Sequence, residues 1–351
     1  MSIPHELQPA HTLWPLYNPA SAPHAFRALT QTDAIAWQST TRDALAKTLK
    51  LDMFTRQHAD VTLIRSVDKG DFVRHKYLLR TGAHTVMPFY LLIPKNVTTP
   101  LPTVVAFAGH GYGVADIVGL WEDGSERTRA NGYHADFAVA LCRAGFAVAA
   151  PEISCFGERQ TDFGYLDDVN GQPIPGSTCT HTAMLAFHLG LSVPSMRVHD
   201  ALCLVDYLAT RADLDIQRLG AMGISGGGMH TLFSMCIDER FKAGIISGYF
   251  STFRDSILAM HHCACNFVPG LATFGEMHDL AGLIAPRPLF IEAGTRDPIF
   301  PIGAVQRGVS NARAVYRIFE ASQRITLNVF EGRHEVHGGP AYPWLKAQLA
   351  Y

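Results

Sequence analysis

The strongest indication of chemistry in this sequence is a serine within a glycine-rich stretch. The stretch G-I-S-G-G spans Gly223–Gly227, between an apolar strand-like run at 218–224 and a helical run at 226–237. A strand that turns sharply into a helix exposes the residue at its apex, and small residues two positions away let strand and helix approach. Ser225 would stand at a helix N-terminus, where unpaired N–H groups favour negative charge. The pattern favours a nucleophilic serine over an ordinary glycine turn.

A serine nucleophile needs a base and an acid that orients the base, and in this topology both follow the serine in the chain. Asp297 lies in G-T-R-D-P-I-F-P, just past the strand-like run at 289–293, and His334 lies four residues past Phe330, the end of another run. We therefore predict a triad of Ser225, Asp297 and His334. Alternatives remain for the two residues that assist the serine: Glu292 or Asp279 could be the acid, and His337 could be the base.

The loop after the strand-like run at 103–108 has the sequence A-G-H-G-Y-G, and it is suited to an oxyanion hole. Such a hole needs two backbone N–H donors that converge on one oxygen, and glycines let a backbone approach the substrate. Gly226, directly after the serine, is predicted to give the first donor. The N–H of Tyr112 is predicted to give the second, with Gly111 as the next candidate.

Two irregular stretches, at 155–191 and 249–278, interrupt the pattern of strands and helices and could fold over the site as a cap. They contain many aromatic residues, which would make a small apolar pocket for short acyl groups. The alternative is that these rings only pin the loops to the protein. Candidate substrate-binding residues in the second stretch are Tyr249, Phe250, His261, Asn266 and Phe267.

The same stretch contains the cluster His261, His262, Cys263 and Cys265. Its spacing is not that of a structural zinc site, because no second close pair of ligands follows at a suitable distance. We therefore interpret these residues as packed loop residues or a pocket wall. The sequence predicts no metal and no cofactor.

The elements around these motifs indicate an α/β fold. Helical periodicity occupies 25–51, and β-like runs follow at 61–67, 72–79 and 86–93. From residue 102 onward, continuous apolar strands alternate with helices, which indicates a mostly parallel sheet with helices on both faces. Further strands are predicted at 103–108, 146–150, 218–224, 242–247, 289–293 and 325–330, and further helices at 136–143, 195–209, 226–237, 303–320 and 341–349. We divide the chain into an N-terminal helical extension, 1–60, and a catalytic domain, 61–351.

Composition excludes several classes of protein. Of 351 residues, 48% are hydrophobic and 17% are charged, which argues against disorder. The formal net charge is −2 with no block of like charge, so we expect no nucleic-acid partner. The apolar runs are too short for a membrane helix, and the N-terminal residues lack the pattern of a secretory signal. Seven cysteines, an odd number, make a disulfide framework improbable and favour the reducing cytoplasm.

With these motifs in order, the sequence resembles the α/β-hydrolase superfamily, and within it the dienelactone-hydrolase-like and acetyl-esterase-like branch. The resemblance covers the chain from about residue 60 onward. It implies an eight-stranded, mostly parallel sheet and the triad of Ser225, Asp297 and His334. True dienelactone hydrolases commonly carry cysteine at the position of Ser225, so ordinary carboxylic esters are favoured over lactones. The motifs that carry the resemblance are G-H-G-Y-G at 109–113, A-P-E at 150–152, D-Y-L-A-T-R at 206–211, G-I-S-G-G-G at 223–228, A-P-R-P at 285–288, G-T-R-D-P-I-F-P at 294–301 and G-R-H at 332–334.

The sequence thus predicts a serine hydrolase that cleaves small carboxylic esters through an acyl-enzyme. A peptidase or amidase on the same triad is the alternative enzyme, because the prolyl-oligopeptidase branch is similar in topology. A binding scaffold that has lost catalysis is the alternative outside enzymes. The N-terminal extension could pack on the domain, close the site or mediate assembly into a homo-oligomer.

Overall fold

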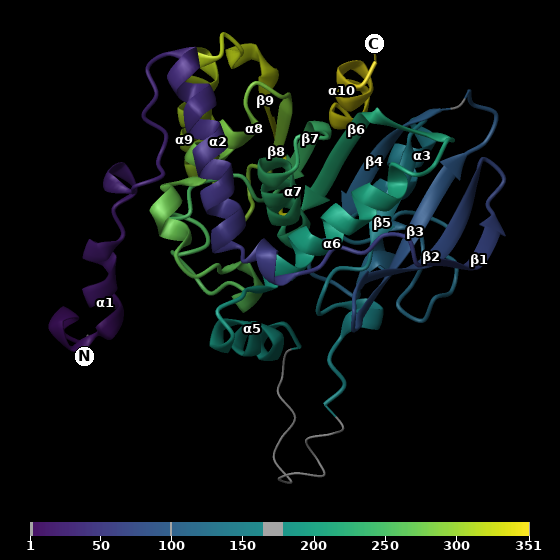
Figure 1. Ribbon diagram of the computed structural model, residues 1–351, viewed down its shortest axis with the longest axis horizontal. Helices are drawn as coiled ribbons and strands as arrows, with labels where there is room; N and C mark the ends of the chain where they lie inside the picture. The colour runs from purple at the N-terminus through teal and green to yellow at the C-terminus, as the bar shows by residue number, and fades with distance from the viewer. Residues whose placement is uncertain (1–2, 99, 164–177, 351) are drawn as a thin grey trace.

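A single nine-stranded sheet runs through the protein (Figure 1). The computed structural model describes residues 3–98, 100–163 and 178–350. The strands lie in the order β1-β2-β3-β5-β4-β6-β7-β8-β9. Their bounds are β1(Val61–Asp68), β2(Phe72–Gly82), β3(Thr85–Pro94), β4(Leu101–Phe107), β5(Ala147–Pro151), β6(Leu214–Ile224), β7(Phe241–Ser247), β8(Leu289–Gly294) and β9(Ile325–Phe330).

The sheet is mixed but mostly parallel, as the apolar strands predict. Strands β1, β2, β3 and β5 pair antiparallel in that order, whereas β5, β4, β6, β7, β8 and β9 pair parallel. All nine runs predicted from the sequence form strands. The resemblance implied eight, and that number is wrong, because β1 adds an antiparallel edge strand along β2. The parallel strands end at one edge of the sheet, where ligands bind in open α/β folds.

Helices cover both faces of the sheet, as predicted. Residues of α2, α6, α7, α8 and α9 pack in one core, and residues of α3 and α10 pack in a second core across the sheet. Figure 1 shows α2, α6 and α7 in front of the strands and α1 at the periphery, where Ala10 and Leu13 line a cavity with Phe253. The bounds are α1(Pro9–Leu13), α2(Gln31–Thr48), α3(Phe137–Arg143), α5(Thr178–His188), α6(Val193–Leu208), α7(Gly226–Ile237), α8(Met277–Ile284), α9(Ile302–Ile318) and α10(Ala341–Gln348).

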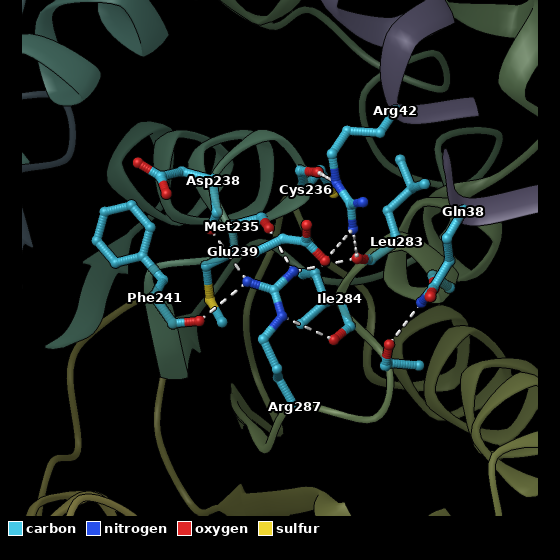
Figure 2. Close-up of polar contacts among 12 residues, drawn as sticks. Gln38, Arg42, Met235, Cys236, Asp238, Glu239, Phe241, Leu283, Ile284 and Arg287 are labelled. Atoms are coloured by element: carbon cyan, nitrogen blue, oxygen red, sulfur yellow. Dashed lines mark hydrogen bonds and ion pairs between the residues drawn. The ribbon is translucent and has the colours of Figure 1, made fainter. Parts of the chain in front are cut away.

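Helix α2, within the segment predicted as an N-terminal extension, shares the core of the sheet. Its Thr30 cap accepts a hydrogen bond from the N–H of Asp33, which satisfies a free donor at the helix start. Leu45 is fully buried. Gln38 donates to the carbonyls of Gly282 and Ala285 (Figure 2). A division of the chain at residue 60 stays a prediction.

Two arginines, Arg42 in α2 and Arg287 after α8, donate hydrogen bonds to carbonyls near the ends of α7 and α8 (Figure 2). Arg42 donates to the carbonyls of Cys236 and Leu283, both at 2.9 Å. The half-buried Arg287 donates to five carbonyls at or near the ends of α7 and α8. Helix C-termini present unpaired carbonyls and partial negative charge, so a guanidinium there is stabilising. The carbonyls that Arg287 contacts belong to Met235, Asp238, Phe241, Leu283 and Ile284.

The two stretches predicted as cap insertions contain short helices. The first stretch, 155–191, holds η6(Gly157–Arg159) and α5, and its residues 164–177 lie outside the described part of the chain. The second stretch holds η7(Ala264–Asn266) and η8(Leu271–Phe274). Among the described residues, no helix combines the length and apolar character needed to cross a bilayer.

Candidate active site

Ser225 lies at the turn between β6 and α7, with the backbone conformation of a strained apex. Its φ of 56° and ψ of −123° are rarely adopted by residues other than glycine. A Cβ at Gly223 would collide with the backbone of Gly227, and a Cβ at Gly227 would collide with the carbonyl of Phe107 in β4. Glycine at both positions is therefore required for strand and helix to approach, as the sequence predicts. The turn places Ser225 at the N-terminus of α7.

Asp297 and His334 meet beyond the ends of β8 and β9. The Nδ1–H of His334 donates to Oδ2 of Asp297 at 2.7 Å. The other oxygen of Asp297 accepts the N–H groups of Ile299 and Phe300. Nε2 of His334 is buried and has no partner among the described residues. Gly248 leaves room for this imidazole, because a Cβ there would lie 3.1 Å from the ring.

A cavity of about 290 Å³ brings Ser225 and His334 together. Imidazole, aromatic and aliphatic side chains form most of its wall. The rings of Tyr133 and Phe300 stack on His334 from 5.5 and 5.7 Å between centroids, so the imidazole is held on two sides. The lining residues are His110, Tyr133, Ser225, His261, His262, Cys263, Asn266, Ile299, Phe300 and His334.

The competing acids and base are engaged elsewhere. Glu292 is buried and accepts hydrogen bonds from Ser247 Oγ and the N–H of Gly338, and burial raises its pKa. Asp279 caps the start of α8. His337 is exposed and stacks on the ring of Phe330. Of the candidates raised by the sequence, the pair in hydrogen-bond contact is Asp297 and His334.

Buried polar side chains hold the predicted oxyanion loop, 109–113. The N–H of Gly109 donates to Nε2 of His134, and Nδ1–H of His134 donates to Asp116. The hydroxyl of Tyr133 donates to the carbonyl of His110, and burial raises its pKa.

Glu152 supports the same loop from below. It accepts the N–H of Val114 at 2.9 Å, and a Cβ at Gly113 would collide with its carboxyl group. Burial raises the pKa of Glu152 to about 8. Of the groups that hold the loop, Glu152 belongs to the A-P-E motif at 150–152, whereas His134 and Tyr133 lie outside the motifs quoted from the sequence.

The three predicted oxyanion donors lie in different settings. Gly226 follows Ser225 and faces the imidazole of His110. Gly111 lines a neighbouring cavity of about 420 Å³ together with His110. The side chain of Tyr112 is turned toward Arg127 and the carbonyl of Leu120. Each donor stays a prediction.

The five predicted substrate-binding residues separate into two groups. His261 and Asn266 line the cavity with Ser225. Tyr249 and Phe250 are buried in the core, and Phe267 lines another cavity beside the N-terminal segment. Four residues that line this cavity were not predicted as site residues: His110, Tyr133, Ile299 and Phe300. Of these, Ile299 and Phe300 directly follow the G-T-R-D-P turn, and that nearness was the available signal.

His110 also has cysteine neighbours. Its Nε2 lies 3.2 Å from Sγ of Cys265. Together with Cys179 and Cys263 these residues form a group whose four ligand atoms all lie within 4.8 Å of one another. We call this group, His110, Cys179, Cys263 and Cys265, the Cys3His cluster.

The fold and the site define a class: a nine-stranded α/β protein with a serine at the strand-to-helix turn and a histidine–carboxylate pair beyond later strands, as in α/β-hydrolases. Comparison with protein families agrees with this class. More than half of the chain, residues 15–196, matches the Abhydrolase family, and residues 192–262 match the prolyl oligopeptidase family. The chain belongs to the Abhydrolase family, within the α/β-hydrolase superfamily.

Individual relatives are distant in sequence. YtaP of Bacillus subtilis (strain 168), assigned as a hydrolase, is 24% identical over 273 residues, which cover 76% of this chain and 83% of that protein. A Bacteroides fragilis protein (BF1801) assigned as an acetyl xylan esterase superposes with a TM-score of 0.79 at 14% identity, covering 100% of this chain and 97% of that one. A glucuronoyl esterase from Solibacter usitatus superposes with a TM-score of 0.64 at 16% identity, covering 95% and 100%. These structures share the fold.

Proposed function

We propose that this hydrolase is a serine esterase whose catalytic residues are Ser225, His334 and Asp297. The observation that carries the proposal is the position of His334. Its Nδ1–H is held by Asp297, while its Nε2 is buried at a cavity that Ser225 also lines and has no partner in the described part of the chain. A base needs that arrangement, with one nitrogen fixed in its tautomer and the other free to take a proton.

The reaction proceeds in two halves. Ser225 Oγ attacks the acyl carbon while Nε2 of His334 takes the serine proton. The tetrahedral intermediate then expels the alcohol, which receives that proton from His334, and the acyl group stays on Ser225. In the second half, His334 takes a proton from water, the hydroxide attacks the acyl carbon, and Ser225 regains its proton as the acid leaves. Asp297 stabilises the imidazolium in both halves.

The oxyanion of each intermediate requires donors near the start of α7. The N–H of Gly226 is one, since it is an unpaired donor at a helix N-terminus directly after Ser225. The second comes from the loop 109–113, with the N–H of Tyr112 or Gly111 as the candidates.

The cavity supports a substrate with a short acyl group. A volume of about 290 Å³ lies at the small end of ligand pockets, which span roughly 300 to 1,000 Å³. Ile299 and Phe300 present apolar surface beside His334. We expect kcat/KM to be highest for acetyl to butyryl esters and to fall steeply by octanoyl. Acetyl esters are also named for one of the structural neighbours, the acetyl xylan esterase.

A fluorophosphonate probe tests the nucleophile, and paired substrates test the reaction. We expect the probe to label Ser225 stoichiometrically, as seen by peptide mapping, and to leave Ser225→Ala unlabelled. The labelled protein should lose its activity on p-nitrophenyl acetate. Labelling at another serine would overturn the assignment. Activity on anilides that equals activity on matched esters would favour an amidase, in keeping with the prolyl oligopeptidase match around Ser225.

We place the enzyme in the cytoplasm. All seven of its cysteines are unpaired, and a reducing compartment keeps thiols in that form.

A further inference from the structure

The Cys3His cluster joins three segments that are far apart in the chain. His110 belongs to the loop after β4, Cys179 to the first turn of α5, and Cys263 and Cys265 flank the start of η7. Cys179 and Cys265 are buried, with 3% and 0% of their surface exposed, and the other two are half-buried. The two stretches predicted as cap insertions therefore meet the oxyanion loop at this point.

We propose that the Cys3His cluster binds one zinc ion. Three thiolates and one imidazole are a ligand set of structural zinc sites, and such sites are tetrahedral. With Zn–S bonds of about 2.3 Å and Zn–N bonds of about 2.0 Å, the ligand atoms of a tetrahedron lie roughly 3.5 to 3.8 Å apart. All four ligand atoms already lie within 4.8 Å of one another. Shifts on the order of 1 Å would bring these atoms to tetrahedral spacing.

The ligand set also selects the metal. Soft sulfur ligands bind zinc in preference to magnesium, calcium or manganese, which take oxygen ligands. All four positions of the tetrahedron come from the protein, so no open position remains for water or substrate. The ion therefore acts structurally, and the ester chemistry proposed for Ser225 does not pass through it.

The buried Arg197 provides an independent observation that points to a negatively charged group here. Its side chain has no exposed surface, and among the described residues no carboxylate pairs with it. It donates one hydrogen bond, from Nη2 to the carbonyl of Ser154, while Nε and Nη1 have no partner in the described part of the chain. The guanidinium lies beside the imidazole of the cluster, since a Cβ on Gly226 would be 3.1 Å from the ring of His110 and 3.7 Å from Nη1 of Arg197. An unpaired buried cation is strongly unfavourable.

Zinc in the Cys3His cluster balances this charge. Three thiolates, a neutral imidazole and a divalent cation together carry one net negative charge, and Arg197 carries one positive charge. The unpartnered N–H groups of Arg197 are then free to donate to the metal-bound sulfurs. Hydrogen bonds of this kind to metal ligands commonly orient them and strengthen metal binding.

His110 connects the metal to the active site. One edge of its ring faces the position directly after Ser225, where a Cβ on Gly226 would lie 3.1 Å from Cε1 and Nδ1. The opposite nitrogen, Nε2, faces Cys265. Zinc bound to Nε2 would fix the loop 109–113 and tie α5 and η7 to it, so the cap and the oxyanion loop would keep one relative position.

Elemental analysis of the full chain tests the proposal directly. The protein should be expressed in zinc-supplemented medium, freed of any histidine tag and purified under reducing conditions without chelator. We expect close to one zinc ion per chain by mass spectrometry. The double variant Cys263→Ser/Cys265→Ser should contain only background zinc, whereas Cys142→Ser, which removes a buried thiol in the opposite core, should retain it. Zinc-free wild type, or variants with the full amount, would overturn the proposal.

A second measurement needs no variant and therefore no assumption about folding. Alkylation of the native wild-type protein, followed by peptide mapping, reports each thiol separately. We expect a chelator to increase the labelling of Cys179, Cys263 and Cys265 at least tenfold and to leave that of Cys203 unchanged. A disulfide between two cluster cysteines, or labelling that is insensitive to chelator, would count against zinc. Both readouts are independent of ester hydrolysis, so failure of the proposed function would not affect them.

Discussion

The proposed catalytic residues and the Cys3His cluster share a cavity wall, yet they are built in different ways. Ser225, Asp297 and His334 each follow a strand of the same sheet, so the hydrogen-bond ladder determines where each one emerges. The cluster takes His110 from the loop after β4, but its three cysteines come from α5 and the segment around η7, which no ladder aligns. Side chains at strand ends can be aligned by backbone alone, whereas loop residues need a further interaction to hold them together. We infer that zinc is that interaction.

Removal of the serine nucleophile should have the largest effect on kcat and should separate the residues at the strand ends from the Cys3His cluster. Ser225→Ala should lower kcat by roughly four to six orders of magnitude with an unchanged thermal midpoint, because the strand-end scaffold does not depend on Oγ. His334→Ala should be as severe, and the double variant should be little worse. The control His337→Ala should retain most activity. Steady-state kinetics on a short ester measures all four variants, and a reversed ranking of the two histidines would move the base to His337.

Loss of the orienting charge should have the next largest effect. Asp297→Asn keeps the side-chain volume and its acceptor oxygen but favours the wrong tautomer of His334, so kcat should fall by about 10⁴. The matched control is Asp279→Asn, which alters the α8 cap far from the cavity and should act on stability instead. A silent Asp297→Asn would show that another acid holds the imidazole.

A change in the loop region should be far milder. Tyr133→Phe removes the hydroxyl that donates to the carbonyl of His110 but keeps the ring that stacks on His334. One lost hydrogen bond amounts to about 1 kcal/mol, so kcat/KM should fall by roughly tenfold or less. If kcat falls by a thousandfold or more, Tyr133 contacts the reacting atoms and the division between the two regions fails.

The last prediction concerns the pH dependence of stability and involves His230, which is buried in α7. Burial, aided by the charge of Arg197, lowers the pKa of His230 to about 3. Because its unfolded value is about 6.5, the unfolded chain binds the extra proton between these limits, and stability should decrease as the pH falls through that window. One proton corresponds to a slope of up to about 1.4 kcal/mol per pH unit.

His230→Gln keeps a donor for the carbonyl of Arg197 and removes the titration, so urea midpoints at pH 7, 6 and 5 should depend less on pH than in wild type. The exposed His84→Gln serves as the control. An equal pH dependence in wild type and His230→Gln would show that other groups cause the acid instability.

The sequence predicted the sheet well because apolar runs, turns and glycines are local signals. All nine strand runs form strands, and the helix predicted at 226–237 has those bounds. Helices α5 and α8 were missed, since α5 falls in a stretch rich in turn residues and α8 is only eight residues long. The contact of Asp297 with His334 could be anticipated because both follow parallel strands.

The Cys3His cluster could not be predicted in this way. The sequence contains no second close pair of ligands at a suitable distance from Cys263 and Cys265. The structure adds single residues, His110 and Cys179, which are brought near by tertiary folding and not by spacing along the chain. For the same reason the support of the loop by His134 left no local signal, and the A-P-E motif did not reveal that its Glu152 holds the loop.

The anchoring of α2 has a consequence for the order of events during synthesis. Gln38 donates a hydrogen bond to the carbonyl of Ala285, which is 247 residues further along the chain. At the usual rates of translation, α2 leaves the ribosome roughly 10 to 50 seconds before that partner exists. During this interval the apolar side chains of α2, including Leu45, lack the packing partners that later bury them. The first long helix to be synthesised is thus among the last to pack. Until the C-terminal half of the sheet emerges, the nascent chain exposes this apolar surface.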